Sequence, residues 1–350
     1  AAFAVDALEV HILIDLNGHS KGSRMGVLLR RPAPILMTYL GYPSTSGALD
    51  DILVADKWVC PPETKDLYTE KLVYLPSSYF VNDHRQLYPR PFHHSPTREE
   101  NSLPESRVLI GNFGQLYKVE PKLFKLWARI VKRVEGTSLW LLKFPKEAVK
   151  RLQQQAKKQG LSDQQFVLTN LLPIDSHLAI KSLADIALDT MVFNGHTTGA
   201  DTLWAGIPLV SISGEQMRSR AGASMAYSLG ITSWLVRDLE EYEELSVRLT
   251  ASRTKLAAAK RELERAIEDS PFFDTYYWAK GFERSWFQLW DTFQATGKAQ
   301  EMHIITSSGG LEDYGKDWNP ENIMIGTTRQ KHSQRATGAE GSKGPKFDPL

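Results

Sequence analysis

The sequence predicts an α/β fold that is built on mostly parallel sheets and divided into two domains. Short apolar runs alternate with helical patterns along the chain, which is typical of βαβ units. Its 350 residues, 42% hydrophobic and 24% charged, suffice for two globular domains and exclude a wholly disordered chain. Residues 89–106 are rich in proline, histidine, serine and charge without periodicity, so we expect a linker there.

Charge and cysteine content exclude several classes of protein. Lys and Arg total 42 against 41 Asp and Glu, so the chain has no electrostatic footprint for nucleic acid or an anionic membrane. No apolar run approaches the roughly 20 residues that span a bilayer. The single cysteine, Cys60, excludes a disulfide framework and a cysteine-rich metal site. We therefore expect a soluble protein of a reducing compartment, in the cytoplasm or the nucleus.

The first domain, residues 1–88, is expected to contain four short strands. Each is rich in apolar residues and ends near a turn signal, such as the GYPSTSG stretch (41–47) or Pro61-Pro62. The predicted strands cover residues 10–16, 34–42, 51–56 and 72–76.

The second domain, residues 107–298, continues the alternation of strands and helices. Apolar side chains keep helical spacing from Leu123 to Val134, and Pro121 suits a first helical turn. Predicted strands cover 107–113, 138–144, 166–171, 184–191 and 208–213, and predicted longer helices cover 121–134, 147–159, 239–268 and 275–295. The chain then becomes polar and Gly-rich, so we expect a disordered tail over 299–350.

The most informative segment is NGHTTGAD (194–201), which lies between a predicted strand and a short helix. Its glycines let the backbone turn tightly, and the unpaired N–H groups of a helix start, together with the helix dipole, can bind phosphate. Thr197 and Thr198 add hydroxyl donors, and Asp201 is a candidate acceptor for ribose hydroxyls. A capped loop that binds nothing is the alternative interpretation.

Three other places are candidates for the ligand-facing edge of the sheets. Lys118, in NFGQLYK, is a compact cation able to neutralise a leaving diphosphate, and Gln115 is a candidate donor to phosphate or sugar. His177 is a candidate to pack on a nucleobase, and the 41–47 loop a candidate to bind sugar through its backbone. Each has an ordinary alternative: a solvated lysine, a helix cap, a structural histidine and a plain turn.

Motifs for metals and common cofactors are missing from the sequence. It has no GxGxxG fingerprint, Walker P-loop, HExxH sequence, paired-cysteine spacing or G-x-S-x-G elbow. We therefore expect no resident metal or cofactor.

Several segments, in collinear order from about residue 10 to 295, resemble the catalytic region of the protein O-GlcNAc transferases, the family that includes SPINDLY. They are HILIDLNGHSKGSR, RPAPI, LGYPSTSGA, NFGQLYKVEP, SLWLLKFP, LADIALDT, NGHTTGADTLWAGIP and GEQMRSRAGAS. The resemblance implies a GT-B fold, with two Rossmann-like lobes and parallel sheets, the first lobe only partly present. It also implies metal-independent, inverting transfer of N-acetylglucosamine from UDP-GlcNAc to Ser or Thr hydroxyls of intracellular proteins.

The same resemblance assigns roles to individual residues. It implies that Lys118 contacts the donor phosphates and is the catalytic residue of the chain, that His177 packs on the uracil, and that Asp201 binds ribose. The HTTG loop is implied to hold the diphosphate and the sugar, and the LGYP turn to line the sugar pocket. The implied donor-binding residues are Gln115, His177, His196, Thr197, Thr198, Asp201, Leu40, Gly41 and Pro43.

The sequence departs from the family pattern at several points. Ile174 and Ile180 stand where a lysine and an arginine usually flank the uracil histidine, with Lys181 as a candidate substitute, and Gly114 replaces a usual asparagine. The family's first lobe begins with a segment that carries an aspartate and a histidine near the acceptor, preceded by tetratricopeptide repeats through which an oligomer could form. Neither is present, so we expect an N-terminally truncated chain, inactive alone, in which no catalytic base can be named.

Three alternatives stay open. A SPINDLY-type protein O-fucosyltransferase using GDP-fucose shares the fold. Its counterparts of NGHTTG and NFGQLYK differ, which favours GlcNAc, but the isoleucines beside His177 keep this alternative open. A catalytically silent protein that binds a sugar nucleotide or acts as a scaffold is the second. A GT-B transferase acting on small molecules or lipids is the third.

Overall fold

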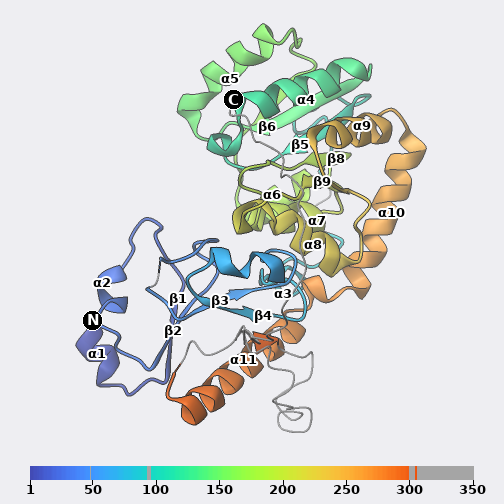
Figure 1. Ribbon diagram of the computed structural model, residues 1–350. Coiled ribbons are helices and arrows are strands. Elements are labelled where there is room, and N and C mark those ends of the chain that lie inside the picture. The colour runs from blue at the N-terminus through green and yellow to red at the C-terminus, as the bar shows by residue number, and fades with distance from the viewer. Residues whose placement is uncertain (48, 93–95, 299–303, 306–350) are drawn as a thin grey trace, which may run out of the picture.

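The protein contains two parallel sheets, each the centre of one lobe, with helices packed around them (Figure 1). The computed structural model describes residues 1–47, 49–92, 96–298 and 304–305. Every strand pairing in both sheets is parallel, which confirms the predicted α/β class.

The first sheet has the strand order β1-β2-β3-β4-β11. Its strands are β1 (Ile12–Asp15), β2 (Ile35–Thr38), β3 (Ile52–Ala55), β4 (Lys71–Tyr74) and β11 (Ile304–Ile305). Every residue of β2 and β3 is buried, as expected for inner strands of a parallel sheet that are covered on both faces. Its short helices are α1 (Ala2–Asp6), α2 (Met25–Leu28), η1 (Pro62–Leu67) and α3 (His84–Leu87).

The second sheet has the order β10-β9-β8-β5-β6-β7. Its strands are β5 (Val108–Asn112), β6 (Thr137–Leu142), β7 (Phe166–Thr169), β8 (Ile186–Leu188), β9 (Leu209–Ile212) and β10 (Leu235–Val236). The chain moves outward from β5 to β7, then crosses back to β8 and moves outward in the other direction. This is the doubly wound order, and its switch point lies between β5 and β8, where such sheets bind ligands at the carboxyl ends of the strands.

The helices of the second half differ from the sequence prediction at one place. Their bounds are η2 (Leu116–Lys118), α4 (Pro121–Arg133), α5 (Lys146–Lys158), α6 (Ile174–Lys181), α7 (Thr197–Trp204), η3 (Met217–Ser219), α8 (Ala221–Leu229), α9 (Leu239–Thr250), α10 (Arg253–Asp269), η4 (Pro271–Phe273) and α11 (Thr275–Thr296). The single helix expected over 239–268 is two helices, α9 and α10. The side chain of Ser252 accepts a hydrogen bond from the backbone N–H of Lys255, and this N-cap begins a new helix.

The long helix α11, which the sequence grouped with the second domain, packs against the first sheet (Figure 1). The ring of Tyr39 after β2 lies 5.5 Å from Trp278 and 5.1 Å from Phe282, measured between ring centroids. The strand β11 then pairs with β4. Apart from Ile304–Ile305, the tail predicted over 299–350 lies outside the described residues.

The two lobes are joined by the buried carboxylate of Asp56, directly after β3. Its Oδ1 accepts the backbone N–H of Trp58 at 2.8 Å, and its Oδ2 accepts the N–H of Tyr79 at 2.7 Å. Its Oδ2 also accepts the hydroxyl of Ser224 on α8 at 2.5 Å, and Ser224 contacts Ser78 at 2.7 Å. A helix of the second lobe is thereby attached to two loops of the first.

The described part of the linker packs on the second lobe. One guanidinium nitrogen of Arg98 donates to the carbonyl of Leu183 and to the carboxylate of Asp185, both at 2.8 Å. Within the described ranges, no helix is both long and apolar enough to cross a membrane.

Candidate active site

A cavity of about 400 Å³ lies between the lobes and collects residues that are far apart in the sequence. The turn after β2 contributes Leu40, Gly41 and Pro43, and the second lobe contributes Phe193, His196 and Thr197. Residues 80–84 complete the wall. Five residues that the sequence associated with the sugar donor are therefore brought together: Leu40, Gly41, Pro43, His196 and Thr197. The volume lies in the range of ordinary ligand pockets.

Gly41 can hold its place in this wall only as glycine. A Cβ atom at this position would lie 1.9 Å from the carbonyl oxygen of Leu16, which is backbone and cannot move aside cheaply. The absence of a side chain lets the turn lie directly against the segment after β1.

The loop from Asn194 to His196 is fixed by a buried carboxylate, Asp189, directly after β8. Asp189 Oδ1 accepts the N–H groups of Thr190 and Gly195, both at 2.8 Å, and Oδ2 accepts the hydroxyl of Ser211 at 2.7 Å. Burial raises the pKa of Asp189 to about 6, while these hydrogen bonds oppose the rise. The carboxylate thus attaches the loop to the end of the sheet.

Asn194 closes the loop from its other side. Its side-chain amide donates to the carbonyl of Thr190 at 2.6 Å, and its Oδ1 accepts the N–H of Gly222 on α8 at 3.1 Å. Sequence reasoning assigned no role to Asp189 or Asn194. The available signal was their position after a strand, at the ligand-facing edge, but their partners on β9 and α8 could not be deduced from spacing.

The start of α7 presents unpaired backbone donors next to the cavity. The N–H groups of Thr197, Thr198 and Gly199 have no acceptor among the described residues, and the first backbone bond of the helix runs from Ala200 to His196 at 3.0 Å. The positive end of the helix dipole adds to these donors. The side chain of Thr197 is exposed and that of Thr198 is half-buried. This arrangement is suited to a diphosphate.

His196 is held neutral, and one of its ring nitrogens has no partner within the described structure. Its Nδ1 lies 3.1 Å from the carbonyl oxygen of Asn194, which places the proton on Nδ1. Burial, with the nearby charge of Lys118, lowers the pKa of His196 to about 4. Its Nε2 is buried and has no hydrogen-bond partner in the described structure. A ligand hydroxyl in the cavity could therefore donate to Nε2.

Lys118 lies across the switch point, on η2 after β5. Its Nζ donates to the carbonyl of Asn194 at 3.1 Å and lies 3.9 Å from the ring centroid of Phe193, which lines the cavity. Desolvation lowers the pKa of Lys118 to about 8, and the negative charge of Asp189 opposes this shift. Gln115, three residues earlier, is exposed. The structure thus brings the expected phosphate-binding cation to the HTTG loop.

Asp201 has partners that the sequence did not indicate. Its Oδ2 accepts from Lys181 Nζ at 2.7 Å, and its Oδ1 lies 2.9 Å from His84 Nε2. All three side chains are buried, and His84, not Asp201, lines the cavity. The structure therefore does not place Asp201 on the cavity wall as an unpaired acceptor for ribose. Lys181, considered as a reader of the base, is occupied by this ion pair.

His177 is buried beside the ring of Phe113, with centroids 6.3 Å apart in an edge arrangement. Burial and the charge of Lys181 lower its pKa to about 4. Its Nδ1 is buried without a partner among the described residues. Of the flanking isoleucines, Ile174 is partly exposed and Ile180 is buried, so neither offers a polar contact to a base.

No group of three metal-binding side chains is found among the described residues. What the geometry provides instead is a cation, three helix-start N–H groups and a neutral imidazole around one interlobe cavity. A doubly wound lobe and a second parallel-sheet lobe that hold such a site between them define the GT-B fold of glycosyltransferases. The crystal structure of Anabaena HepE with UDP and glucose shares this fold, with a TM-score of 0.56 at 13% identity over 82% of this chain and 81% of that one.

The chain belongs to glycosyltransferase family 41, whose family model matches residues 1–95 and 93–282. It is 39% identical over 85% of its length to the probable UDP-N-acetylglucosamine–peptide N-acetylglucosaminyltransferase SEC of Arabidopsis thaliana, covering 31% of that protein. The Petunia hybrida SPINDLY protein, with the same probable activity in its name, is 31% identical over 81% of this chain and 30% of its own length. A mutant O-GlcNAc transferase of Thermobaculum terrenum has a TM-score of 0.74 at 27% identity, over 84% of this chain and 56% of that one. The chain thus spans about a third of these curated relatives.

Proposed function

We propose that this chain carries the donor-binding half of an inverting transferase that moves N-acetylglucosamine from UDP-GlcNAc to Ser or Thr hydroxyls of proteins. The observation that carries this proposal is that Lys118 is held on the loop leading into α7, by its contact with the Asn194 carbonyl, while the first N–H groups of α7 stay unpaired among the described residues. The names of the family 41 relatives supply the donor and the acceptor class.

The chemistry follows from charge. Breaking the bond between the anomeric carbon and the phosphate oxygen leaves negative charge on UDP. An ammonium at Lys118 and the N–H groups of Thr197, Thr198 and Gly199 stabilise that charge as it develops, in a site partly withdrawn from water. His196 Nε2 accepts a hydrogen bond from a sugar hydroxyl and orients the ring. In this proposal no divalent metal is needed, and activity of the complete enzyme is retained in EDTA.

The proposal includes a cytoplasmic or nuclear location and protein acceptors that meet the enzyme there. An oligomer formed through tetratricopeptide repeats is also part of it. Support for the reducing compartment comes from the low cysteine content of the sequence, whose single cysteine, Cys60, has no second cysteine to pair with.

A GDP-fucose donor is the second candidate, and the side chains around His177 keep it open. Ile174 and Ile180 offer no polar contact to a uracil edge, and Lys181 is paired with Asp201. Positions 174, 180 and 181, on either side of His177, therefore offer no free polar side chain that would select uracil.

Calorimetric titration of the chain with UDP, and in parallel with GDP, tests the proposal. We expect UDP to bind more tightly, and the Lys118→Met variant to bind it more weakly, because one phosphate-neutralising charge is lost. Lys122→Met, an exposed lysine on α4, is the matched control and leaves UDP affinity unchanged. A preference for GDP would support the fucose donor. Failure of a folded wild-type chain to bind either nucleotide would refute the donor site.

A further inference from the structure

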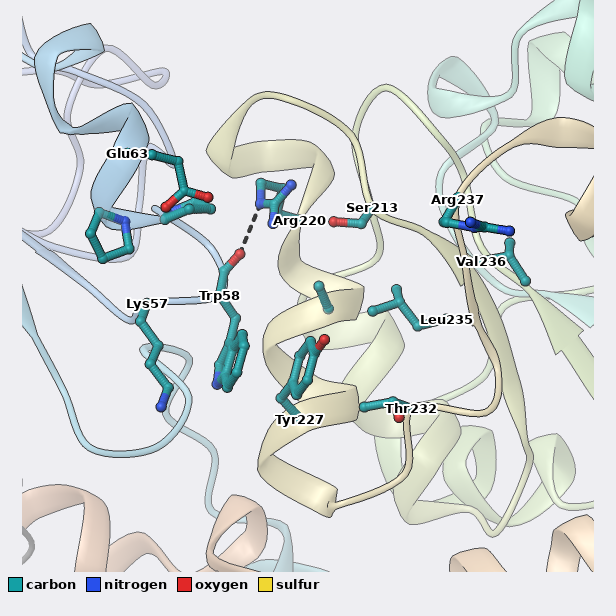
Figure 2. A pocket seen from close by; sticks show the side chains of 13 residues that line it. Lys57, Trp58, Glu63, Ser213, Arg220, Tyr227, Thr232, Leu235, Val236 and Arg237 are labelled. Carbon is teal, nitrogen blue, oxygen red and sulfur yellow. Dashed lines mark hydrogen bonds between the residues drawn. The ribbon is translucent and has the colours of Figure 1, made fainter.

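A second and larger cavity, of about 670 Å³, opens between the lobes on the side of α8 (Figure 2). From the first lobe it is lined by Lys57 and Trp58 after β3 and by residues 61–63 at the start of η1. From the second lobe it is lined by Ser213 after β9, by Arg220 and α8, and by residues in and next to β10. It has no lining residue in common with the donor cavity. The proposed donor chemistry makes no use of it.

Its apolar wall is preorganised by aromatic stacking across the lobes. The rings of Trp58 and Tyr227 lie parallel, 3.6 Å apart with a 4° angle between their planes. Lys57 Nζ lies 4.6 Å from the Trp58 ring centroid. The backbone of Trp58 is fixed at both ends, because its N–H donates to Asp56 and its carbonyl accepts from Arg220 at 2.8 Å. A ligand therefore meets a wall that needs little ordering.

Two polar groups at this cavity lack protein partners. Arg220 uses Nε and Nη1 to hold the carbonyls of Trp58 and Gly214, while its Nη2 makes no hydrogen bond within the described residues. The hydroxyl of Ser213 is buried and unpartnered there. Figure 2 shows the Ser213 hydroxyl pointing toward Arg220. An anionic oxygen between them would satisfy both groups.

The charge of the lining also favours an anion. Lys57, Arg220 and Arg237 stand against the single carboxylate of Glu63. Arg237 is paired with Glu241 from the next helix, and even with that carboxylate counted the positive charge exceeds the negative by one. The cations surround apolar surface, so the fitting ligand combines a carboxylate or phosphate with an apolar neighbour.

We propose that this cavity binds an acidic side chain of the polypeptide acceptor, next to the hydroxyl that is modified. The inference rests on the proposed function, since a protein acceptor must enter the cleft that holds the donor. The two cavities are linked through two buried residues, Tyr79 and Asp56. Tyr79 donates its N–H to Asp56, which holds Trp58, and its ring lies 6.2 Å from that of His196 in the donor cavity. An extended peptide that runs along the cleft could place a hydroxyl at one cavity and a carboxylate at the other.

Fluorescence anisotropy with a short labelled peptide, in which a serine is flanked by glutamates, tests the inference. We expect this peptide to bind the full chain and its glutamine counterpart to bind at least about fivefold more weakly. The double variant Lys57→Gln/Arg237→Gln should weaken binding of the glutamate peptide by about five- to tenfold, since both side chains are exposed and their loss leaves the fold intact. Lys65→Gln, on η1 but outside the lining, is the matched control and should change binding less than about twofold.

The outcomes separate this inference from the function on which it rests. Equal affinity for the glutamate and glutamine peptides would overturn it, as would an unchanged affinity in the double variant. Displacement of the peptide by inorganic phosphate at equal concentration would assign the cavity to a free phosphate ion instead. UDP binding, measured on the same samples, should be unaffected by Lys57→Gln/Arg237→Gln. If wild-type chain binds no UDP, the proposed function fails, whatever the peptide does.

Discussion

At the scale of single residues, the charge of Lys118 is set by two opposing effects. Desolvation at the switch point favours the neutral amine, and the carboxylate of Asp189 favours the ammonium; the first is larger, so the pKa falls to about 8. The ammonium form still dominates at pH 7. This balance makes the proposed phosphate site sensitive to pH within an accessible range.

We predict that UDP affinity is steady up to about pH 8 and then falls toward tenfold per pH unit, since binding above this pKa requires Lys118 to take up a proton. Calorimetry between pH 7 and 9 measures this, over a range that lies above the last pKa of a terminal phosphate, about 6. Lys118→Arg should flatten the profile because a guanidinium stays charged throughout. Lys122→Arg should keep the wild-type profile, and a flat wild-type profile would contradict the role of Lys118.

Single residues also show how far sequence reasoning reaches. Lys118 could be predicted as a site residue because it follows a recognisable strand at the ligand-facing edge, and the structure places it against the loop that contains Asn194. His196 could be predicted only through the family resemblance. The pairing of Asp201 with His84 and Lys181 could not, because the three residues come from three separate elements. A buried polar side chain is defined by partners that only the fold brings near.

At the scale of elements, a buried ion cluster connects α3 of the first lobe to α6 and α7 of the second. Asp201 on α7 holds Lys181 of α6 at 2.7 Å and His84 of α3 at 2.9 Å. Burial lowers the pKa of Lys181, while His84 and Lys181 together hold the pKa of Asp201 below its usual value. The helix start that faces the proposed diphosphate is thereby fixed relative to the base-binding side.

Replacing one charged member of this cluster should lower the free energy of unfolding more than replacing two. Asp201→Asn keeps a partner for His84 but leaves a buried ammonium uncompensated, so we expect a loss of about 3 kcal/mol in the free energy of unfolding. Adding Lys181→Met should restore part of that loss. Urea denaturation measures both. Lys280→Met with Glu283→Gln, a more exposed pair on α11, should cost less than about 1 kcal/mol. Additive effects at the buried pair would exclude direct coupling.

The helices and strands also show where apolar periodicity in the sequence fails to predict the structure. Apolar spacing predicted most strands and helices of the second sheet, but it continued through Ser252 and merged α9 with α10. The break depends on one side-chain hydrogen bond to the backbone of Lys255. A two-residue strand such as β10 is too short for any periodic pattern to reveal.

At the scale of the whole molecule, the chain crosses between the lobes more than once. α10 runs along the side of the second lobe toward the first, and α11 then covers the first sheet (Figure 1). The aromatic face of α11 predicts that the helix packs against a sheet, but it does not reveal which one. The sequence pattern assigned the helix to the second domain. The first lobe is therefore completed by residues from the far end of the chain.

The position of α11 predicts which sheet a mutation in this helix destabilises. Phe282 is 8% exposed and packs on Tyr39, Trp278 and Trp286, so Phe282→Ala should remove about 3–5 kcal/mol of stability. Hydrogen exchange should speed up in β2 and β3 and stay slow in β5 and β6, because α11 covers only the first sheet.

Tyr276→Ala, on the same helix but 67% exposed, is the matched control and should leave exchange in both sheets as in the wild type. Equal acceleration in β2 and β6 after Phe282→Ala would mean that the lobes unfold as one unit. The contacts of Asp56 with Ser224 and of Trp58 with Tyr227 would then dominate over the separate cores. Faster exchange confined to the first sheet would show instead that the second lobe keeps its fold, and with it the loop that holds Lys118, when the first lobe opens.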